Sequence, residues 1–459
     1  MSVPRTIVVG GGLAGLSAAH TLLEHGKNVL LLDKMPSLGG NSVKASSGIN
    51  GAGTAPQQAL DIQDSVEVFF ADTAASAGPD LARPALITAL TANSAGAIAW
   101  LAGTFGVDLS VVSRLGGHTA ARTHRDPGGA PGWTITSALM KRLTADTARA
   151  EIVKSARVVR LLEDAGSVVG VEYEAGGALV EARGTVVLAT GGYAADFRPG
   201  GLLAQHRPEL LPLSTTNGEH ATGDGARLAT ALARPAGLCD LDQVQVHPTG
   251  FVDPARPDAK TKFLAAEALR GAGALLLDAH GARFVDEVGR RDVVTAAMQA
   301  AAGPVRLVLG TAAAEEVRSH CGFYASKGLM KRYADAAAFA ADTGIPLESI
   351  RATFASYSSY ASGAEMDPFA RATFRNASYT AEEPLHVAII TPVVHYTMGG
   401  LAVDAHARVL TADSATPIPG LFAAGEVIGG VHGRNRLAGS SLLEAVVFGR
   451  LAGEGAAKA

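Results

Sequence analysis

A glycine-rich loop close to the N-terminus places the strongest constraint on how this chain folds. Residues 6–9 (TIVV) form a short β-branched run, residues 10–15 read GGGLAG, and residues 16–24 have the apolar spacing of a helix. This order predicts a strand, a tight turn and a helix. The free N–H groups and the dipole at the start of such a helix favour a negatively charged ligand. The segment therefore predicts a site for a phosphate-bearing molecule.

Three glycines and one acidic residue complete a dinucleotide-binding βαβ pattern. Gly10 suits the tight turn, Gly12 lets the backbone approach a pyrophosphate, and Gly15 allows the helix to pack on the strand. An apolar run at residues 29–32 ends in Asp33, 21 residues beyond Gly12, where a carboxylate can accept hydrogen bonds from ribose hydroxyls. This pattern alone does not distinguish NAD from FAD.

The composition narrows the classes of partner. The chain has 459 residues, of which 47% are hydrophobic and 18% charged, which is typical of a compact protein with a large core. A net charge of −4 without a basic run argues against nucleic acid and against a polybasic membrane surface. Only Cys239 and Cys321 are present, so we expect no disulfide framework and no metal site. A small-molecule partner and a cytoplasmic location fit best, and the oligomeric state stays open, with a monomer as one option.

Two apolar runs resemble targeting or membrane segments. Residues 6–23 follow Arg5 as in a signal peptide, but their triple glycine argues against one. Residues 84–107 hold no charge over a length that could span a bilayer, yet they include threonines, an asparagine and glycines. We expect helices of a soluble protein there, with membrane contact as the alternative.

The pattern along the rest of the chain predicts an α/β fold whose nucleotide domain is discontinuous. Residues 51–150 have helical spacing, residues 152–182 read as a meander of short strands, and residues 184–192 form a buried strand that returns to the parallel sheet. From about residue 242 titratable residues gather and Pro-Gly loops interrupt helices such as 333–342. Glycine-rich segments return after residue 395, before a final helix that begins near residue 440.

Charged and titratable residues gather in five short groups, several of them beside glycines. They are 247–249 (HPT), 267–271 (EALRG), 286–292 (DEVGRRD), 395–397 (HYT) and 434–436 (RNR). Glu267 and Arg270 would share one face of a helix, and arginine suits carboxylates because its planar fork donates paired hydrogen bonds. Taken singly, each group could be a surface ion pair, a solvated turn or a buried histidine. Together, in a chain with few charges, they favour an active site.

Several sequence motifs together match the pattern of a known protein family. They are residues 39–50 (GGNSVKASSGIN), 247–249, 267–271, 395–400 (HYTMGG) and 430–433 (GVHG). Over nearly its whole length the chain resembles the soluble fumarate reductases of the fumarate reductase/succinate dehydrogenase flavoprotein family. The resemblance implies a Rossmann-type FAD-binding domain in two pieces, residues 1–241 and 396–459, with an α+β capping or clamp domain inserted at 242–395. Asn41 stands where membrane-bound relatives carry the histidine that attaches FAD, which implies noncovalent FAD.

The resemblance also implies a reaction and its residues. Reduced FAD would deliver hydride to the double bond of fumarate, and Arg291 would donate the proton, resupplied through Arg270 and Glu267. The predicted substrate contacts are His247, His395, Arg436 and Gly439. The predicted cofactor contacts are Gly10, Gly12, Leu13, Ala14, Gly15, Asp33, Lys34, Gly40, Asn41, Ser42, Ser46, Gly48, Ile49, Asn50, Thr190, Gly191, Asp224, Gly425, Glu426, Arg436, Ser441 and Leu442. Asp224 could instead cap a helix.

Departures from the family pattern keep other functions open. Ala266 stands where some relatives have a substrate-contacting threonine, and Arg434 and Ala438 flank Arg436 where alanine and glycine are common. Arg434 is either a solvated surface residue or added positive charge near the clamp. The alternatives are reduction of another unsaturated acid, such as urocanate or an acrylate, a dehydrogenase reaction, and a noncatalytic electron-transfer role. With no haem motif and no iron–sulfur cysteine set, we expect a diffusible electron donor such as reduced flavin.

Overall fold

The N-terminal strand lies inside a six-stranded sheet in the computed structural model, which describes residues 5–128 and 130–459. β1 (Arg5–Val9) pairs in parallel with β2 (Asn28–Asp33) and β10 (Val186–Leu188). β6 (Ala150–Lys154) and β20 (Pro417–Ala423) extend the parallel part, and β19 (Arg408–Leu410) adds an antiparallel edge. The order is β19-β20-β10-β1-β2-β6, so the chain returns to this sheet near its C-terminus. The predicted α/β fold is confirmed.

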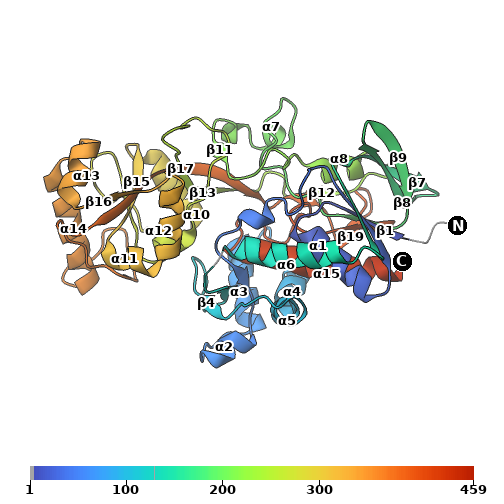
Figure 1. Ribbon diagram of the computed structural model, residues 1–459, viewed down its shortest axis with the longest axis horizontal. Helices are drawn as coiled ribbons and strands as arrows, with labels where there is room; N and C mark the ends of the chain where they lie inside the picture. Colours follow the sequence, from blue (N-terminus) through green and yellow to red (C-terminus); the bar gives the residue numbers. More distant parts are fainter. Residues whose placement is uncertain (1–4, 129) are drawn as a thin grey trace.

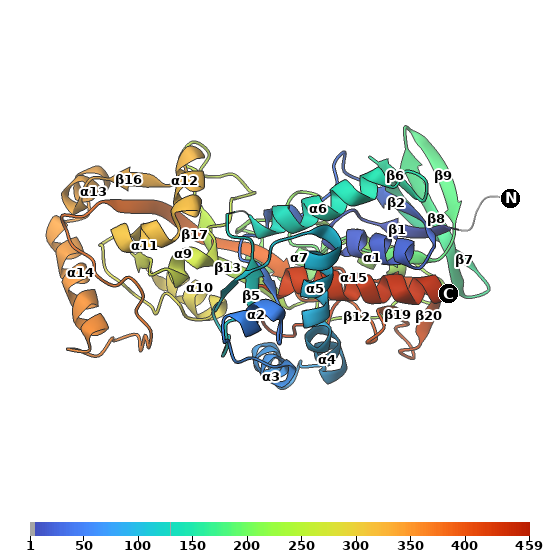
Figure 2. The same ribbon diagram turned by 60° about the horizontal axis from the view of Figure 1, so that its bottom comes forward.

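Two helices from opposite ends of the chain lie side by side against this sheet (Figures 1 and 2). They are α1 (Leu13–Glu24) and α15 (Ser440–Lys458). A Cβ atom built at Gly449 would lie 2.5 Å from the carbonyl oxygen of Ala14, and one at Gly453 would lie 2.8 Å from that of Ala18. The two glycines of α15 therefore let the backbones approach closely, which joins the last segment of the chain to the first.

The predicted meander is an antiparallel three-stranded sheet next to the parallel one. It consists of β7 (Arg157–Asp164), β8 (Ser167–Ala175) and β9 (Ala178–Arg183). The inclusion of residues 152–154 in this meander was wrong. They belong to β6, where they pair with β2, because a buried parallel strand and a short meander strand carry the same apolar signal.

Helices predominate between residues 51 and 150, as predicted. They are α2 (Ala55–Ala59), α3 (Val66–Ala77), α4 (Pro84–Ala92), α5 (Ser94–Phe105) and α6 (Pro131–Ala145), beside a small sheet of β3 (Ile49–Asn50), β5 (Thr123–Arg125) and β4 (Val111–Ser113). The uncharged run forms α4 and α5, a stretch of 22 residues with a mean hydropathy of 1.4 in its most apolar window. Because 56% of that window is buried inside the protein, the run is weak evidence for a membrane span.

A second sheet forms the other end of the molecule, around the long strand β17 (Leu385–Thr397), which runs from the outer lobe toward the centre (Figure 1). Its strands follow the order β11-β17-β15-β14, and β13 and β16 also pair with β17. The other strands of this sheet are β11 (Ser214–Thr215), β13 (Val244–Phe251), β14 (Leu275–Leu277), β15 (Val305–Leu309) and β16 (Lys331–Tyr333). The sheet therefore collects residues from distant parts of the chain.

Short helices surround this second sheet and connect it to the first. They are α7 (Leu202–His206), α8 (Asp224–Thr230), α9 (Glu267–Gly271), α10 (Arg291–Ala300), α11 (Thr311–Glu316), α12 (Arg318–Ser326), α13 (Ala336–Thr343) and α14 (Leu347–Ser362). The helix expected from residue 333 begins later, because Asp335 caps it by accepting a hydrogen bond from the N–H of Ala338 at 2.7 Å. A two-stranded ladder of β12 (Leu238–Cys239) and β18 (Gly400–Leu401) completes the strands.

Candidate active site

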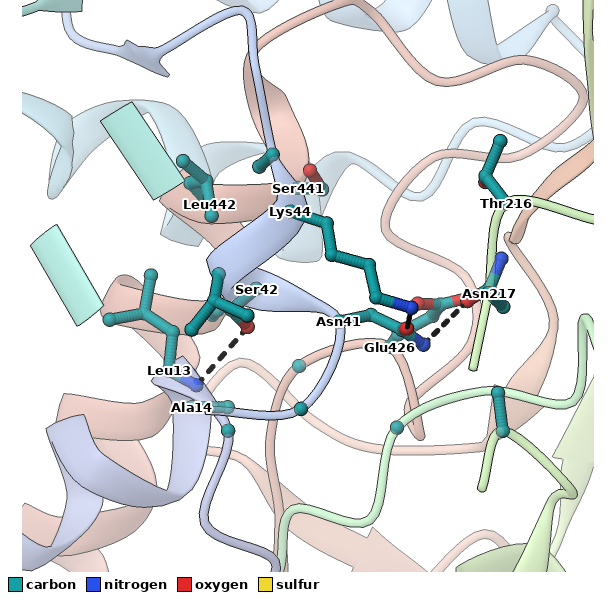
Figure 3. Close-up of a pocket in the computed structure, with 18 of the residues that line it drawn as sticks. Leu13, Ala14, Asn41, Ser42, Lys44, Thr216, Asn217, Glu426, Ser441 and Leu442 are labelled. Carbon is teal, nitrogen blue, oxygen red and sulfur yellow. Dashed lines mark hydrogen bonds between the residues drawn. The ribbon is translucent and has the colours of Figure 1, made fainter. Parts of the chain in front are cut away.

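A cavity of about 660 Å³ extends from the glycine loop to the charged residues beside β17. Its volume falls within the range of cofactor sites, roughly 300 to 1,000 Å³. Figure 3 shows part of its wall. It is lined by most of the predicted cofactor contacts: Gly10, Gly12, Leu13, Ala14, Asp33, Lys34, Gly40, Asn41, Ser42, Ser46, Gly48, Thr190, Gly191, Asp224, Gly425, Glu426, Arg436, Ser441 and Leu442.

Three predicted contacts lie behind the cavity wall instead, namely Gly15, Ile49 and Asn50. A Cβ atom at Gly15 would lie 1.9 Å from the carbonyl oxygen of Gly10, so the glycine permits helix packing. Asn50 donates hydrogen bonds of 2.9 Å to the carbonyl oxygen of Ala438 and to Oγ of Ser440. These residues shape the wall from behind.

The phosphate end of the cavity fits a dinucleotide. Gly12 precedes α1 without a side-chain cap, and the nearest atom to a Cβ built there would be Oγ of Ser42, at 3.7 Å. The N–H of Leu13 donates to that same Oγ at 3.2 Å (Figure 3). Asp33 accepts a 2.7 Å hydrogen bond from the N–H of Gly11, and burial raises the pKa of its carboxyl. The start of α1 is thus open to an anionic ligand.

The acid predicted as a helix cap or ligand contact does not cap α8. Gly223 is the N-cap, and Asp224 is the first helical residue. The Oδ2 atom of Asp224 lies 2.7 Å from Nζ of Lys34, so these two cavity residues form an ion pair. The pair ties the end of β2 to the start of α8.

The amide of Asn41 is held on both sides in the middle of the cavity. Its Nδ2 donates to Oδ1 of Asn217 at 2.7 Å, and its Oδ1 accepts from Nζ of Lys44 at 3.2 Å (Figure 3). The same Oδ1 also accepts from the N–H of Gly218 at 2.9 Å. Burial lowers the pKa of the Lys44 ammonium. Lys44, Thr216 and Asn217 line the cavity but were missed as site residues, although Lys44 lies inside the motif at residues 39–50.

The carboxylate of Glu267, the first residue of the small helix α9, is held by Arg291. Oε2 of Glu267 accepts hydrogen bonds from Nε and Nη2 of Arg291 at 2.8 and 2.6 Å. Arg270 lies on the same helical face as Glu267, as predicted, with Nη2 3.8 Å from that oxygen. All three side chains are buried. The structure therefore brings the predicted proton relay together.

The side chain of Gln245 joins two arginines, which sequence reasoning missed. Its Oε1 accepts from Nη1 of Arg291 at 2.8 Å and from Nη2 of Arg436 at 3.0 Å. Its Nε2 donates to the carbonyl oxygen of Arg436 and to Oδ1 of Asn435. One available signal was its place on β13, two residues before His247 and hence on the same face of an ideal strand. Arg291 and Arg436 both line the cavity.

Two histidines lie beside these arginines, with ring centroids 5.1 Å apart. Burial holds the pKa of His247 and of His395 well below the usual value, and the charges of Arg291 and Arg436 act in the same direction. Both rings are therefore neutral at pH 7. Nδ1 of His395 forms a 2.7 Å hydrogen bond with Oγ1 of Thr216. His395 lines the cavity, whereas His247 lies behind it.

Comparison with known proteins decides the family. The profile of the FAD binding domain family matches residues 5–442. The chain belongs to this family. It is 47% identical to "Fumarate reductase" of Schizosaccharomyces pombe over 98% of this chain and 89% of that protein. It is 41% identical to "Fumarate reductase 1" of Saccharomyces cerevisiae over 99% of this chain and 98% of that one.

A solved structure supports the same family. The open conformation of a flavocytochrome c3 fumarate reductase has a TM-score of 0.81 and 33% identity, over 99% of this chain and 78% of that one. The chain is thus an FAD-dependent oxidoreductase of the fumarate reductase/succinate dehydrogenase flavoproteins. The cavity residues described above are those available to hold its FAD.

Several charged residues that the sequence grouped with the FAD enzyme's site face away from it. Arg434 pairs with Asp80 at 2.6 Å, and their side chains are 61% and 58% exposed, which favours the surface interpretation of Arg434. Arg290 and Asp292 form an exposed pair at 2.7 Å. Of the group at residues 286–292, Arg291 is the member that reaches the cavity, because it begins α10.

Proposed function

We propose that this chain reduces fumarate to succinate with electrons from its FAD. The observation that carries the proposal is the pair of guanidinium groups of Arg291 and Arg436, which share Oε1 of Gln245 at 2.8 and 3.0 Å on the wall of the cofactor cavity. Two adjacent guanidiniums suit an unsaturated dicarboxylate, because Arg436 can donate hydrogen bonds to a carboxylate while Arg291, held by Glu267, adds positive charge and a proton to donate. The fumarate reductases at 47% and 41% identity support this choice of substrate.

The substrate is held at the end of the cavity where Arg436, His395 and Gly439 lie. Neutral His395 donates from one ring nitrogen and leaves the positive charge to Arg436. The ring of Tyr396 lies under the Arg436 guanidinium, 4.4 Å from centroid to Cζ, and limits its movement. His247 supports this group from behind the wall. These contacts to the substrate carboxylates withdraw electron density from the double bond and so activate it.

Arg291 supplies the proton. Reduced FAD, when bound, supplies the hydride. A guanidinium is a weak acid in water, but Arg291 lies between the Glu267 carboxylate and the anionic substrate, so it can give up a proton and regain one that Glu267 has first accepted and then passes on. Arg270, with Nη2 3.8 Å from Oε2 of Glu267, is the other member of the relay that resupplies this proton.

Four further features belong to this proposal. FAD is noncovalent, because the amide of Asn41 has no nucleophile for a flavin bond. The protein is soluble and cytoplasmic, and a diffusible carrier such as reduced flavin delivers the electrons. Residues 1–241 and 396–459 form the FAD-binding domain, and residues 242–395 form the capping domain that closes over the substrate to exclude water.

The test is anaerobic reoxidation of the reduced protein by a panel of unsaturated acids, followed by flavin absorbance. Fumarate should reoxidise the flavin much faster than urocanate, acrylate or buffer. Arg291→Ala should abolish reoxidation by fumarate while the flavin stays bound. Reoxidation by fumarate at the buffer rate would contradict the proposed function, and a faster rate with urocanate or acrylate would replace the substrate.

A further inference from the structure

The peptide bond between Ala438 and Gly439 lies at the substrate end of the cofactor cavity. Gly439 lines this cavity, whereas Ala438 lines a second, smaller cavity of about 120 Å³. The bond is trans, so its carbonyl oxygen and its N–H group point in opposite directions. Any contact that fixes the carbonyl of Ala438 therefore also fixes the direction of the N–H of Gly439.

Two buried side chains hold this carbonyl. The oxygen of Ala438 accepts a hydrogen bond from Nδ2 of Asn50 at 2.9 Å and one from Nε2 of His118 at 3.0 Å. Asn50 is fully buried and His118 is 3% exposed, and neither of them lines either cavity. Both donors thus lie behind the wall, and they leave the N–H of Gly439 directed toward the cofactor cavity.

The amide of Asn50 is itself fixed in one orientation. Its Oδ1 accepts from Oγ1 of Thr123 at 2.7 Å, so Nδ2 is the end that faces Ala438. The backbone N–H of Asn50 donates to the carbonyl oxygen of Gly439 at 3.1 Å. Gly439 has a φ of 79°, and a Cβ atom there would lie 2.3 Å from Oδ1 of Asn50, so glycine is required. Asn50 therefore holds two successive carbonyls of this turn.

His118 can spend its proton only on this contact. Because a carbonyl oxygen only accepts, the ring carries its proton on Nε2. Burial lowers the pKa of His118 to about 4, and the charge of Arg122 acts in the same direction, so the ring is neutral at pH 7. Its Nδ1 is buried and has no hydrogen-bond partner among the described residues. An unpaired buried nitrogen costs stability that an apolar side chain would not, so packing alone does not account for a histidine here.

The N–H of Gly439 is free to bind a ligand. Within residues 5–128 and 130–459 it has no hydrogen-bond partner. Arg436 lies on the same turn, where its Nη1 donates to the carbonyl oxygen of Leu437 at 3.1 Å. The guanidinium and the N–H are thus held in a fixed relation by four consecutive residues. A carboxylate can accept hydrogen bonds from both groups at once.

We propose that His118 and Asn50 are positioning residues for the substrate. They hold the peptide between Ala438 and Gly439 so that its N–H donates to a substrate carboxylate beside Arg436. Neither side chain contacts the substrate itself. Without these two donors the peptide plane can turn, and the N–H no longer points at the carboxylate. The inference rests on the proposed function.

The test removes one donor in the folded holoenzyme. His118→Leu keeps an apolar side chain of similar size but has no donor, and His118→Gln restores an amide N–H close to the position of Nε2. Thr123→Val removes the hydrogen bond that orients Asn50 and so reaches the same peptide by a second route. His20→Leu is the matched control. His20 is also buried, its Nε2 donates to the carbonyl oxygen of Leu139 at 2.9 Å, and it lines neither cavity.

Anaerobic reoxidation of the reduced holoenzyme over a range of fumarate concentrations measures the half-saturating concentration and the maximal rate. His118→Leu should raise the half-saturating concentration about tenfold, as expected for one hydrogen bond to a charged group. The maximal rate should stay within about threefold of wild type, because the N–H binds substrate and transition state alike. His118→Gln should return the half-saturating concentration to within about threefold of wild type, and Thr123→Val should raise it about threefold.

Two controls separate positioning from general damage. His20→Leu should keep the half-saturating concentration of wild type, whatever its Tm. Reoxidation by ferricyanide, which needs no carboxylate site, should proceed at the wild-type rate in every variant. If His118→Leu binds fumarate as well as wild type does, or if His118→Gln binds it as poorly as His118→Leu, the positioning role is wrong. If His118→Leu does not fold, unchanged half-saturation in Thr123→Val would overturn the proposal. If wild type itself does not reduce fumarate, the proposed function fails instead.

Discussion

Oε2 of Glu267 receives both the Nε and the Nη2 hydrogen bonds of Arg291, at 2.8 and 2.6 Å, inside the protein. Burial alone would raise the pKa of Glu267, but the charges of Arg291 and Arg270 outweigh it and lower that pKa to about 2. The resting state is therefore a carboxylate between two guanidiniums. Such a group accepts a proton only briefly, which suits a residue that passes protons on.

The first prediction concerns the charge and proton of this carboxylate. Glu267→Gln keeps an oxygen for Arg291 but cannot carry a proton, so turnover with fumarate should fall by about 100-fold or more while FAD stays bound. Stopped-flow reoxidation and flavin absorbance measure the two quantities. Glu348→Gln, at a side chain that is 81% exposed, should behave as wild type. Turnover of Glu267→Gln within a few-fold of wild type would contradict a proton-carrying role.

The second prediction separates two glycines of the nucleotide loop. Gly12→Ala has room, because the nearest atom is 3.7 Å from the new Cβ, so the FAD-free protein should keep its Tm. The methyl group occupies the approach to the pyrophosphate, so FAD affinity should fall by about tenfold or more. Gly15→Ala has no room, because its Cβ would lie 1.9 Å from the carbonyl oxygen of Gly10. Its Tm should fall clearly.

Calorimetry and FAD titration distinguish the two variants. An equal loss of Tm in both would show that the loop acts only through packing. Unchanged FAD affinity in Gly12→Ala would exclude close approach of the pyrophosphate there.

The third prediction concerns the attachment of FAD. Asn41 uses its amide in hydrogen bonds to Asn217 and Gly218, and it carries no group that forms a bond to flavin. Acid precipitation of the holoenzyme should therefore release all of the flavin into the supernatant, where absorbance at the flavin band measures it. Flavin that stays with the precipitated, washed protein would contradict noncovalent binding.

Local sequence signals predicted the elements that depend on neighbouring residues. The strand, glycine turn and helix at residues 5–24 follow from side chains within a few positions of each other, and the structure confirms them. The short strand at residues 152–154 was assigned to the wrong sheet, because pairing with β2 is a contact across more than a hundred residues. Apolar alternation alone does not specify that partner.

The prediction of the site was likewise limited to residues that are close in sequence. Glu267 and Arg270 were predicted as neighbours because they stand three positions apart on a helix. Gln245 was missed, since its function depends on Arg291 and Arg436, which only the fold brings within hydrogen-bond distance. Arg290 and Arg291 are adjacent in sequence, yet one is exposed and the other buried, which a sequence motif does not distinguish.

The last prediction concerns a buried carboxyl in the cofactor cavity. Oε1 of Glu426 accepts hydrogen bonds from the N–H and Oγ1 of Thr397 at 2.9 and 3.0 Å, which lower its pKa, but burial outweighs them and raises that pKa to about 7. The unfolded chain releases this proton near pH 4.5, whereas the native FAD-free protein keeps it until about pH 7. The free energy of unfolding should therefore fall as the pH rises through this interval, by up to ~3 kcal/mol from this group.

Glu426→Gln tests this contribution because an amide keeps an oxygen for Thr397 and stays neutral at every pH. Urea unfolding of the FAD-free protein at pH 5, 6 and 7 measures the free energy of unfolding. The decline between pH 5 and 7 should be smaller in Glu426→Gln than in wild type, and the two proteins should differ most at pH 7. Glu348→Gln should keep the wild-type decline, since that carboxyl is exposed. An equal decline in wild type and Glu426→Gln would show that Glu426 already ionises at low pH in the native state.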